Sequence, residues 1–121
     1  MADVKIMIVD DSRTSKRILR NLLESQGYEV VAEASDGEEG YVKYQEVKPD
    51  LVTMDITMPK MDGIESLTLI KKFDPDAKVV MITAAGQKEK MVEALKRGAD
   101  EFITKPFDPE EVSSIIKRLT Q

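Results

Sequence analysis

Three acidic side chains stand where apolar runs of this sequence stop. Asp10 and Asp11 follow the run 5–9, and Asp55 follows the run 51–54. If both runs are parallel strands of one sheet, these acids meet at the edge where such sheets place their ligands. Three carboxylates placed together repel one another, so either one takes up a proton or a cation keeps them ionised. A divalent cation is the simpler solution, and the sequence therefore predicts a cation site around Asp55.

The missing residue types narrow the choice of cation. The chain holds no cysteine and no histidine, which excludes thiolate and imidazole metal sites as well as Cys and His catalysis. Oxygen ligands suit Mg²⁺, which prefers octahedral oxygen coordination and keeps several waters, better than they suit Zn²⁺. Mg²⁺ is thus the expected cofactor.

Two further polar groups are expected at the same edge. The Thr83 hydroxyl follows the apolar run 78–82, and the Lys105 ammonium follows the short run 102–103. A cation and Lys105 would offset the charge that develops on the equatorial oxygens of a phosphoryl group, and Thr83 would donate a hydrogen bond to it. Asp55 would then be the nucleophile and form an acyl phosphate.

Strand and helix signals alternate five times along the chain. The apolar runs 5–9, 29–34, 51–54, 78–82 and 102–103 predict buried strands. Helices are predicted to about residue 26, over 36–47, around 64–70, over 88–97 and from 108 onward. The alternation predicts a doubly wound α/β fold, with a parallel sheet, helices on both faces and right-handed crossovers.

Particular residues mark the helix ends. Gly27 is placed for a left-handed C-terminal cap. Asp108 is expected as the N-cap of the last helix, with Pro109 at its first position and Glu111 closing a capping box. The apolar face of the first helix should comprise Ile18, Leu19, Leu22 and Leu23.

Size and charge limit the classes of function. A length of 121 residues predicts one domain over 1–121. The net charge of −5 disfavours direct binding to nucleic acid. No run approaches the ~18 apolar residues of a membrane helix, and no signal peptide is evident. We therefore expect a cytoplasmic protein without membrane insertion.

The site motifs taken together resemble the receiver domain of bacterial two-component response regulators. The motifs are Asp10-Asp11, Asp55 with the stretch 58–63, Thr83-Ala84 and Lys105-Pro106-Phe107. The resemblance covers essentially the whole chain and implies a stand-alone receiver with a flavodoxin-like fold. In that fold the five strands of the parallel sheet have the order 2-1-3-4-5.

The resemblance also implies a role for each site residue. Asp55 would be the phosphoacceptor, and Asp11, Asp55 and the backbone carbonyl of Thr57 would bind Mg²⁺, with Asp10 held near the ion mainly through water. Thr83, Ala84 and Lys105 would bind the phosphoryl oxygens.

The resemblance implies further roles at four positions around this site. Phe102 would turn inward on phosphorylation, and the Lys105–Pro106 bond would be cis. Thr57 and Ala85 occupy the positions at which the family tunes the phosphoryl lifetime. Ala85 has no polar group to orient an attacking water, which predicts slow self-dephosphorylation.

The implied partners are proteins. A sensor histidine kinase or a phosphotransfer protein would dock on the first helix, which carries Arg13, Lys16, Arg17 and Arg20. The altered face, over 88–119, would bind a target in chemotaxis or flagellar motor control, and the unphosphorylated chain would be a monomer. A phosphorelay intermediate would have the same site residues and stays an alternative. The chain would catalyse only its own phosphorylation and dephosphorylation.

Other interpretations are weaker. A phosphatase of the haloacid-dehalogenase type needs Asp-x-Asp at the nucleophile, whereas this chain has Asp55-Ile56-Thr57. Taken singly, Asp55 fits an Asx turn, Thr83 a loop hydroxyl and Phe102 a core aromatic. A receiver-shaped domain that takes no phosphate is the third alternative. What favours the phosphoacceptor interpretation is that all these residues follow strands in the required order.

Overall fold

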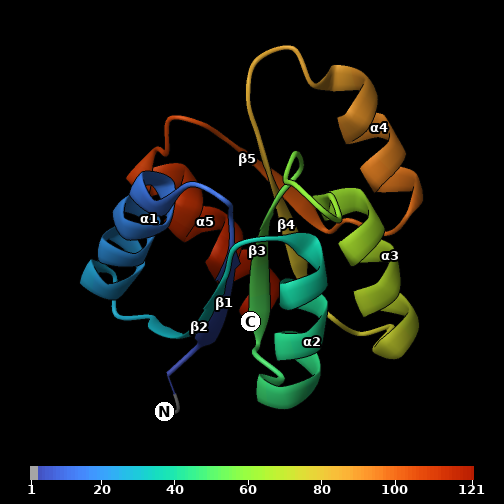
Figure 1. The fold of residues 1–121 in the computed structure, drawn as a ribbon. Coiled ribbons are helices and arrows are strands. Elements are labelled where there is room, and N and C mark those ends of the chain that lie inside the picture. Colours follow the sequence, from blue (N-terminus) through green and yellow to red (C-terminus); the bar gives the residue numbers. More distant parts are fainter. Residues whose placement is uncertain (1–2) are drawn as a thin grey trace.

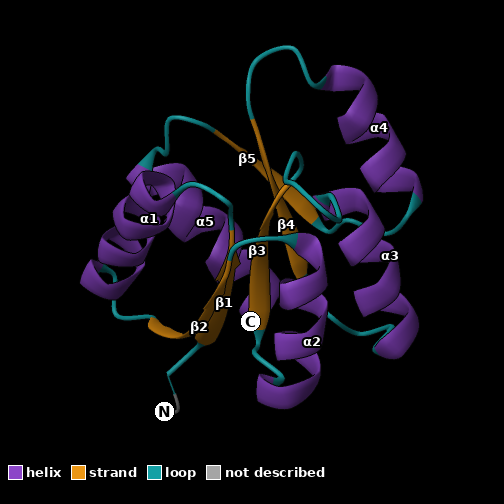
Figure 2. Ribbon diagram, in the orientation of Figure 1, coloured by secondary structure: helices purple, strands orange, loops and turns teal. Residues whose placement is uncertain are grey.

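Five strands and five helices alternate along the chain (Figure 2). The structure is a computed structural model that describes residues 3–121. The strands are β1 (Lys5–Val9), β2 (Glu29–Ala34), β3 (Leu51–Asp55), β4 (Val79–Thr83) and β5 (Glu101–Thr104). The helices are α1 (Arg13–Ser25), α2 (Gly37–Val47), α3 (Gly63–Phe73), α4 (Lys88–Lys96) and α5 (Pro109–Thr120). Each predicted element is present, with ends that differ by at most three residues.

The strands form one parallel sheet in the order β2-β1-β3-β4-β5. Helices α1 and α5 cover one face of the sheet, and α2, α3 and α4 cover the other (Figure 1). This arrangement confirms the doubly wound, flavodoxin-like fold and its strand order. The order reverses between β1 and β3, so the loops that follow these two strands border the position where open α/β sheets bind ligands.

Two apolar layers hold the helices to the sheet. The layer under α2, α3 and α4 includes Met54, Leu67, Ile70 and Ala94, and the layer under α1 and α5 is built around Leu19, Leu23, Val112, Ile115 and Ile116. The central strand β3 is buried on both faces, as its continuous apolar sequence predicts. Within residues 3–121, no helix has the length and apolar character needed to span a membrane.

Two expectations for helix α1 and helix α5 were wrong. Ile18 is 51% exposed, because the buried stripe of α1 runs through Lys16, Leu19 and Leu23, and Ile18 lies outside that stripe. At α5, Asp108 accepts a hydrogen bond from the N–H of Glu110, so the cap closes one residue earlier than a capping box with Glu111. Gly27 has a φ of +90°, which confirms the left-handed residue expected after α1.

The buried hydroxyl of Thr53 gives a stability test. Thr53 lies in the middle of β3 with no exposed surface, and its Oγ1 has no hydrogen-bond partner within residues 3–121. A buried hydroxyl without a partner costs about 1–3 kcal/mol, so Thr53→Val should raise the free energy of unfolding by about 1 kcal/mol. Urea denaturation should show a higher midpoint at an unchanged m-value.

Thr68→Val is the matched control for that substitution. The Thr68 hydroxyl donates to the Ile64 carbonyl at 2.9 Å and accepts from Arg97 at 3.1 Å, so its removal should bring no gain in stability. If Thr53→Val instead lowered the free energy of unfolding, the Thr53 hydroxyl would have to have a hydrogen-bond partner in the folded state, which would contradict this account.

Candidate functional site

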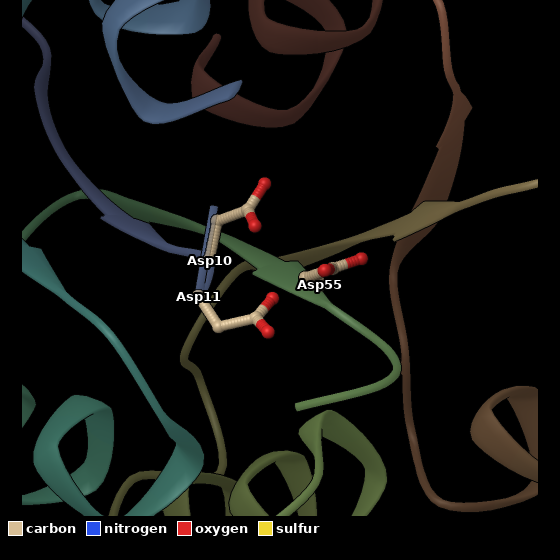
Figure 3. A group of neighbouring side chains, drawn as sticks. All are labelled: Asp10, Asp11 and Asp55. Atoms are coloured by element: carbon tan, nitrogen blue, oxygen red, sulfur yellow. The ribbon is translucent and has the colours of Figure 1, made fainter. Parts of the chain in front are cut away.

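The three acids meet at the carboxyl edge of the sheet. Val9 is paired with Met54 across β1 and β3, which brings the following residues, Asp10 and Asp55, to neighbouring strand ends. One carboxylate oxygen from each of Asp10, Asp11 and Asp55 lies within 4.8 Å of the other two. Figure 3 shows the Asp10 and Asp11 side chains just beyond β1 and the Asp55 side chain at the end of the adjacent β3.

Lys105 reaches this cluster from just beyond the end of β5, two strands away from β3. Its ammonium Nζ lies 3.1 Å from Asp10 Oδ2 and 3.8 Å from Asp55 Oδ2. Its backbone N–H donates to the Thr83 carbonyl at 2.9 Å, and the following bond to Pro106 is cis. Asp10 also accepts a hydrogen bond from the Ser12 N–H at 2.9 Å. The buried Asp10 is therefore better compensated than the half-buried Asp55.

Asp55 is the member of the cluster whose pKa is clearly raised. Burial and, next, the Asp10 charge raise the pKa of its carboxyl from 3.8 to about 6, with a smaller contribution from Asp11 and with Lys105 opposing the rise. Near neutral pH the protein therefore keeps a carboxylate that is costly to ionise. A group that brings positive charge to Asp55 would remove this cost.

The loop that follows Asp55 is held by two glycines. The Gly63 N–H donates to the Ile56 carbonyl at 2.8 Å, and a Cβ on Gly63 would lie 2.0 Å from the Asp55 carbonyl oxygen. On the other side, the Gly37 N–H donates to the Met61 carbonyl at 2.9 Å. Side chains at these glycines would displace the backbone that carries Asp55 and Thr57.

The remaining expected residues lie around the cluster. Thr83 ends β4 and is almost fully buried. Ala84 and Ala85 are exposed in the loop after β4, and Thr57 is exposed in the loop after β3. Phe102, on β5, is half-buried and packs against the apolar layer under α2, α3 and α4.

Sequence reasoning missed Gln87. Its side-chain oxygen accepts a hydrogen bond from the Ala84 N–H at 2.7 Å, and its side-chain nitrogen donates to Thr57 Oγ1 at 2.8 Å. Gln87 thus joins the loop after β3 to the loop after β4. An amide side chain just before an exposed helix is ordinary in a sequence, and the one available signal was its position four residues after Thr83.

The donor atoms at this edge fit a hard divalent cation. Carboxylate oxygens of three aspartates, with the Thr57 carbonyl nearby in sequence, match the oxygen ligands of Mg²⁺. The Lys105 ammonium and the Thr83 hydroxyl add donors for an anion beside that cation. The arrangement can hold a phosphoryl group next to the Asp55 carboxylate.

Comparison with known proteins shows the family of this chain. Residues 6–117 match the family described as the response regulator receiver domain. The chemotaxis protein CheY of Thermotoga maritima is 44% identical over 117 residues, which cover 97% of this chain and 98% of that protein. The chemotaxis protein CheY of Listeria monocytogenes is 47% identical over 115 residues, which cover 95% and 97% of the two chains.

A solved structure agrees with the sequence relatives. A chain in the crystal structure of the CheX-CheY-BeF3-Mg complex of Borrelia burgdorferi superposes with a TM-score of 0.89 at 40% identity, covering 95% of this chain and 87% of that one. Family match, sequence identity and fold all agree. This chain therefore belongs to the receiver domains of response regulators, and it is homologous to the CheY chemotaxis proteins.

Proposed function

We propose that this chain is a phosphorylation-controlled switch in chemotaxis signalling that takes a phosphoryl group onto Asp55 in a Mg²⁺-dependent reaction. The observation that carries the proposal is the convergence of Asp10, Asp11 and Lys105 on the Asp55 carboxylate. This set serves phosphoryl transfer because the negative charge of the nucleophile and of the incoming group must both be compensated. The near-full-length relatives named CheY support the chemotaxis setting.

In this proposal, each site residue has a separate role in phosphoryl transfer to Asp55. An Asp55 carboxylate oxygen attacks the phosphorus, and the bond from phosphorus to the nitrogen of the donor histidine breaks. The Lys105 ammonium, the Thr83 hydroxyl and the Ala84 N–H would donate to phosphoryl oxygens. Asp11, Asp55 and the Thr57 carbonyl would hold Mg²⁺, with Asp10 beside them, and the ion when bound supplies charge compensation for the phosphoryl oxygens.

Helix α1 supplies the docking surface for the phosphodonor. Arg20 is paired with Glu33 and Glu24, and Lys16 donates to the Ser35 hydroxyl at 2.7 Å. Arg13 and Arg17 instead line a shallow surface hollow with Thr14 and the exposed Ile18. An apolar side chain beside two arginines fits a partner helix that is apolar and acidic, such as that of a histidine kinase or a phosphotransfer protein.

The output surface comprises α4, β5 and α5. Val92 and Leu95 on α4 are 46% and 55% exposed, and Phe102 of β5 borders the same region. Phosphorylation shifts the population between two arrangements of this surface because contacts to the phosphoryl group form in only one of them. A flagellar motor protein is the proposed target, and the unphosphorylated chain acts as a monomer.

Phosphorylation of Asp55 tests the proposal directly. The protein with Mg²⁺ and acetyl phosphate should gain one phosphoryl group, measured by intact mass, and should gain none when the metal is chelated. Asp55→Asn should abolish the gain, because an amide does not form an acyl phosphate. Asp76→Asn, which changes an exposed acid at residue 76 in the loop before β4, should leave it intact. Incorporation that persists in Asp55→Asn would refute the assignment.

The raised pKa of Asp55 predicts how stability depends on pH without metal. The unfolded chain releases this proton near pH 3.8, but the folded protein releases it only near its pKa of about 6. The folded state therefore loses stability as pH rises between these values, by roughly 2–3 kcal/mol at ~1.4 kcal/mol per unit of pKa. Asp55→Asn should remove that loss.

Urea denaturation in chelator measures this effect. Asp55→Asn should unfold at higher urea than wild type at pH 7, and the two proteins should unfold at similar urea at pH 4. An Asp55→Asn protein that is less stable than wild type at pH 7 would show that the carboxylate is well compensated without a metal.

A further inference from the structure

The side chain of Gln87 joins the two loops that border the site. Gln87 is the N-cap residue of α4 but makes no side-chain hydrogen bond to that helix. The N-cap side chains of α1, α2, α3 and α5 all bond their own helices. Gln87 instead accepts from the Ala84 N–H at 2.7 Å and donates to Thr57 Oγ1 at 2.8 Å. Both the oxygen and the nitrogen of the Gln87 side-chain amide thus form hydrogen bonds beside the site.

The Ala84 N–H cannot serve two acceptors equally. A backbone amide offers one donor, and in the proposed function this donor binds a phosphoryl oxygen. In the structure the same donor is taken by Gln87 Oε1. Binding of a phosphoryl group to Asp55 therefore requires that the Gln87 side chain leave Ala84 or share it.

We propose that Gln87 is a positioning residue that occupies the Ala84 N–H while Asp55 is unmodified and is displaced from it by the phosphoryl group. This inference rests on the proposed function. The bridge to Thr57 Oγ1 holds the Gln87 amide in place, so Thr57 takes part through its hydroxyl as well as its carbonyl. Gln87 then opposes phosphoryl binding and sets how far the equilibrium lies toward the unmodified arrangement.

Displacement of Gln87 would also loosen the start of α4. Ala94 is the fully buried residue of this helix and lies in its second half, while Met91 is half-buried against the same apolar layer. At the N-terminal end, the amide bridge from Gln87 ties α4 to both loops. Release of the bridge therefore links the state of Asp55 to the position of the output surface.

Beryllofluoride binding at saturating Mg²⁺ measures the competition. Gln87→Ala removes the competitor, so its dissociation constant for beryllofluoride should fall roughly 2- to 10-fold relative to wild type, the factor associated with one net hydrogen bond. Thr57→Val removes the acceptor of the second arm and keeps the carbonyl, so it should tighten binding by a smaller factor. The double variant should bind no tighter than Gln87→Ala, because both changes act on one bridge.

NMR titration measures these dissociation constants, and it also shows whether the Gln87 side chain changes its hydrogen bonds. In wild type, the side-chain NH₂ signals of Gln87 should move toward those of an unbonded glutamine when beryllofluoride is added. Gln45→Ala makes the same chemical change near the C-terminal end of α2 and should leave the dissociation constant unchanged. The Mg²⁺ affinity without beryllofluoride should be the same in wild type and Gln87→Ala.

The outcomes separate this inference from the proposed function. Tighter beryllofluoride binding by Gln87→Ala, with unchanged Mg²⁺ affinity and moving Gln87 signals, supports the displacement. Unchanged or weaker binding by Gln87→Ala overturns it, because Gln87 would then be only a structural support of the loops. Wild type that binds Mg²⁺ but no beryllofluoride would overturn the proposed function itself, and the role of Gln87 with it.

Discussion

Repulsion among three carboxylates at one edge of the sheet is the constraint on which this structure depends. Asp10 and Asp55 are forced together by the pairing of β1 with β3, and Asp11 follows at the next position. Lys105 and the Ser12 N–H compensate Asp10, whereas burial and the Asp10 charge raise the pKa of Asp55. The folded protein thus keeps a carboxylate that Lys105 compensates only in part, at the residue where we propose that a cation and a phosphoryl group bind.

In the proposed function, the loops around Asp55 link phosphorylation of this residue to the surface formed by α4, β5 and α5. Close packing of Gly63 against the Asp55 carbonyl fixes the loop after β3, and Gln87 connects that loop to the start of α4. Helix α4 packs against the core through Ala94 and the half-buried Met91, and its other residues are exposed. In this proposal, a small rearrangement of these hydrogen bonds shifts the equilibrium between two arrangements of the exposed surface of α4.

The sequence predicted the fold because apolar runs and helix signals alternate without ambiguity. It predicted the meeting of Asp10, Asp11 and Asp55 because parallel strands bring their carboxyl ends to one edge. It did not predict the exposure of Ile18, since an apolar residue beside the buried stripe looks the same as one within it. The bridge made by Gln87 was also missed, because it depends on how two loops approach each other and no local pattern encodes that approach.

Calorimetric titration with Mg²⁺ tests the central claim that the carboxylate cluster is a divalent cation site. At pH 7, wild type should bind one Mg²⁺ per chain, and Asp11→Asn should bind it far more weakly because an oxygen ligand and a charge are lost. Bound Mg²⁺ should also raise the thermal midpoint of wild type, since it binds the folded state. Absence of Mg²⁺ binding by wild type, or equal binding by Asp11→Asn, would contradict the account.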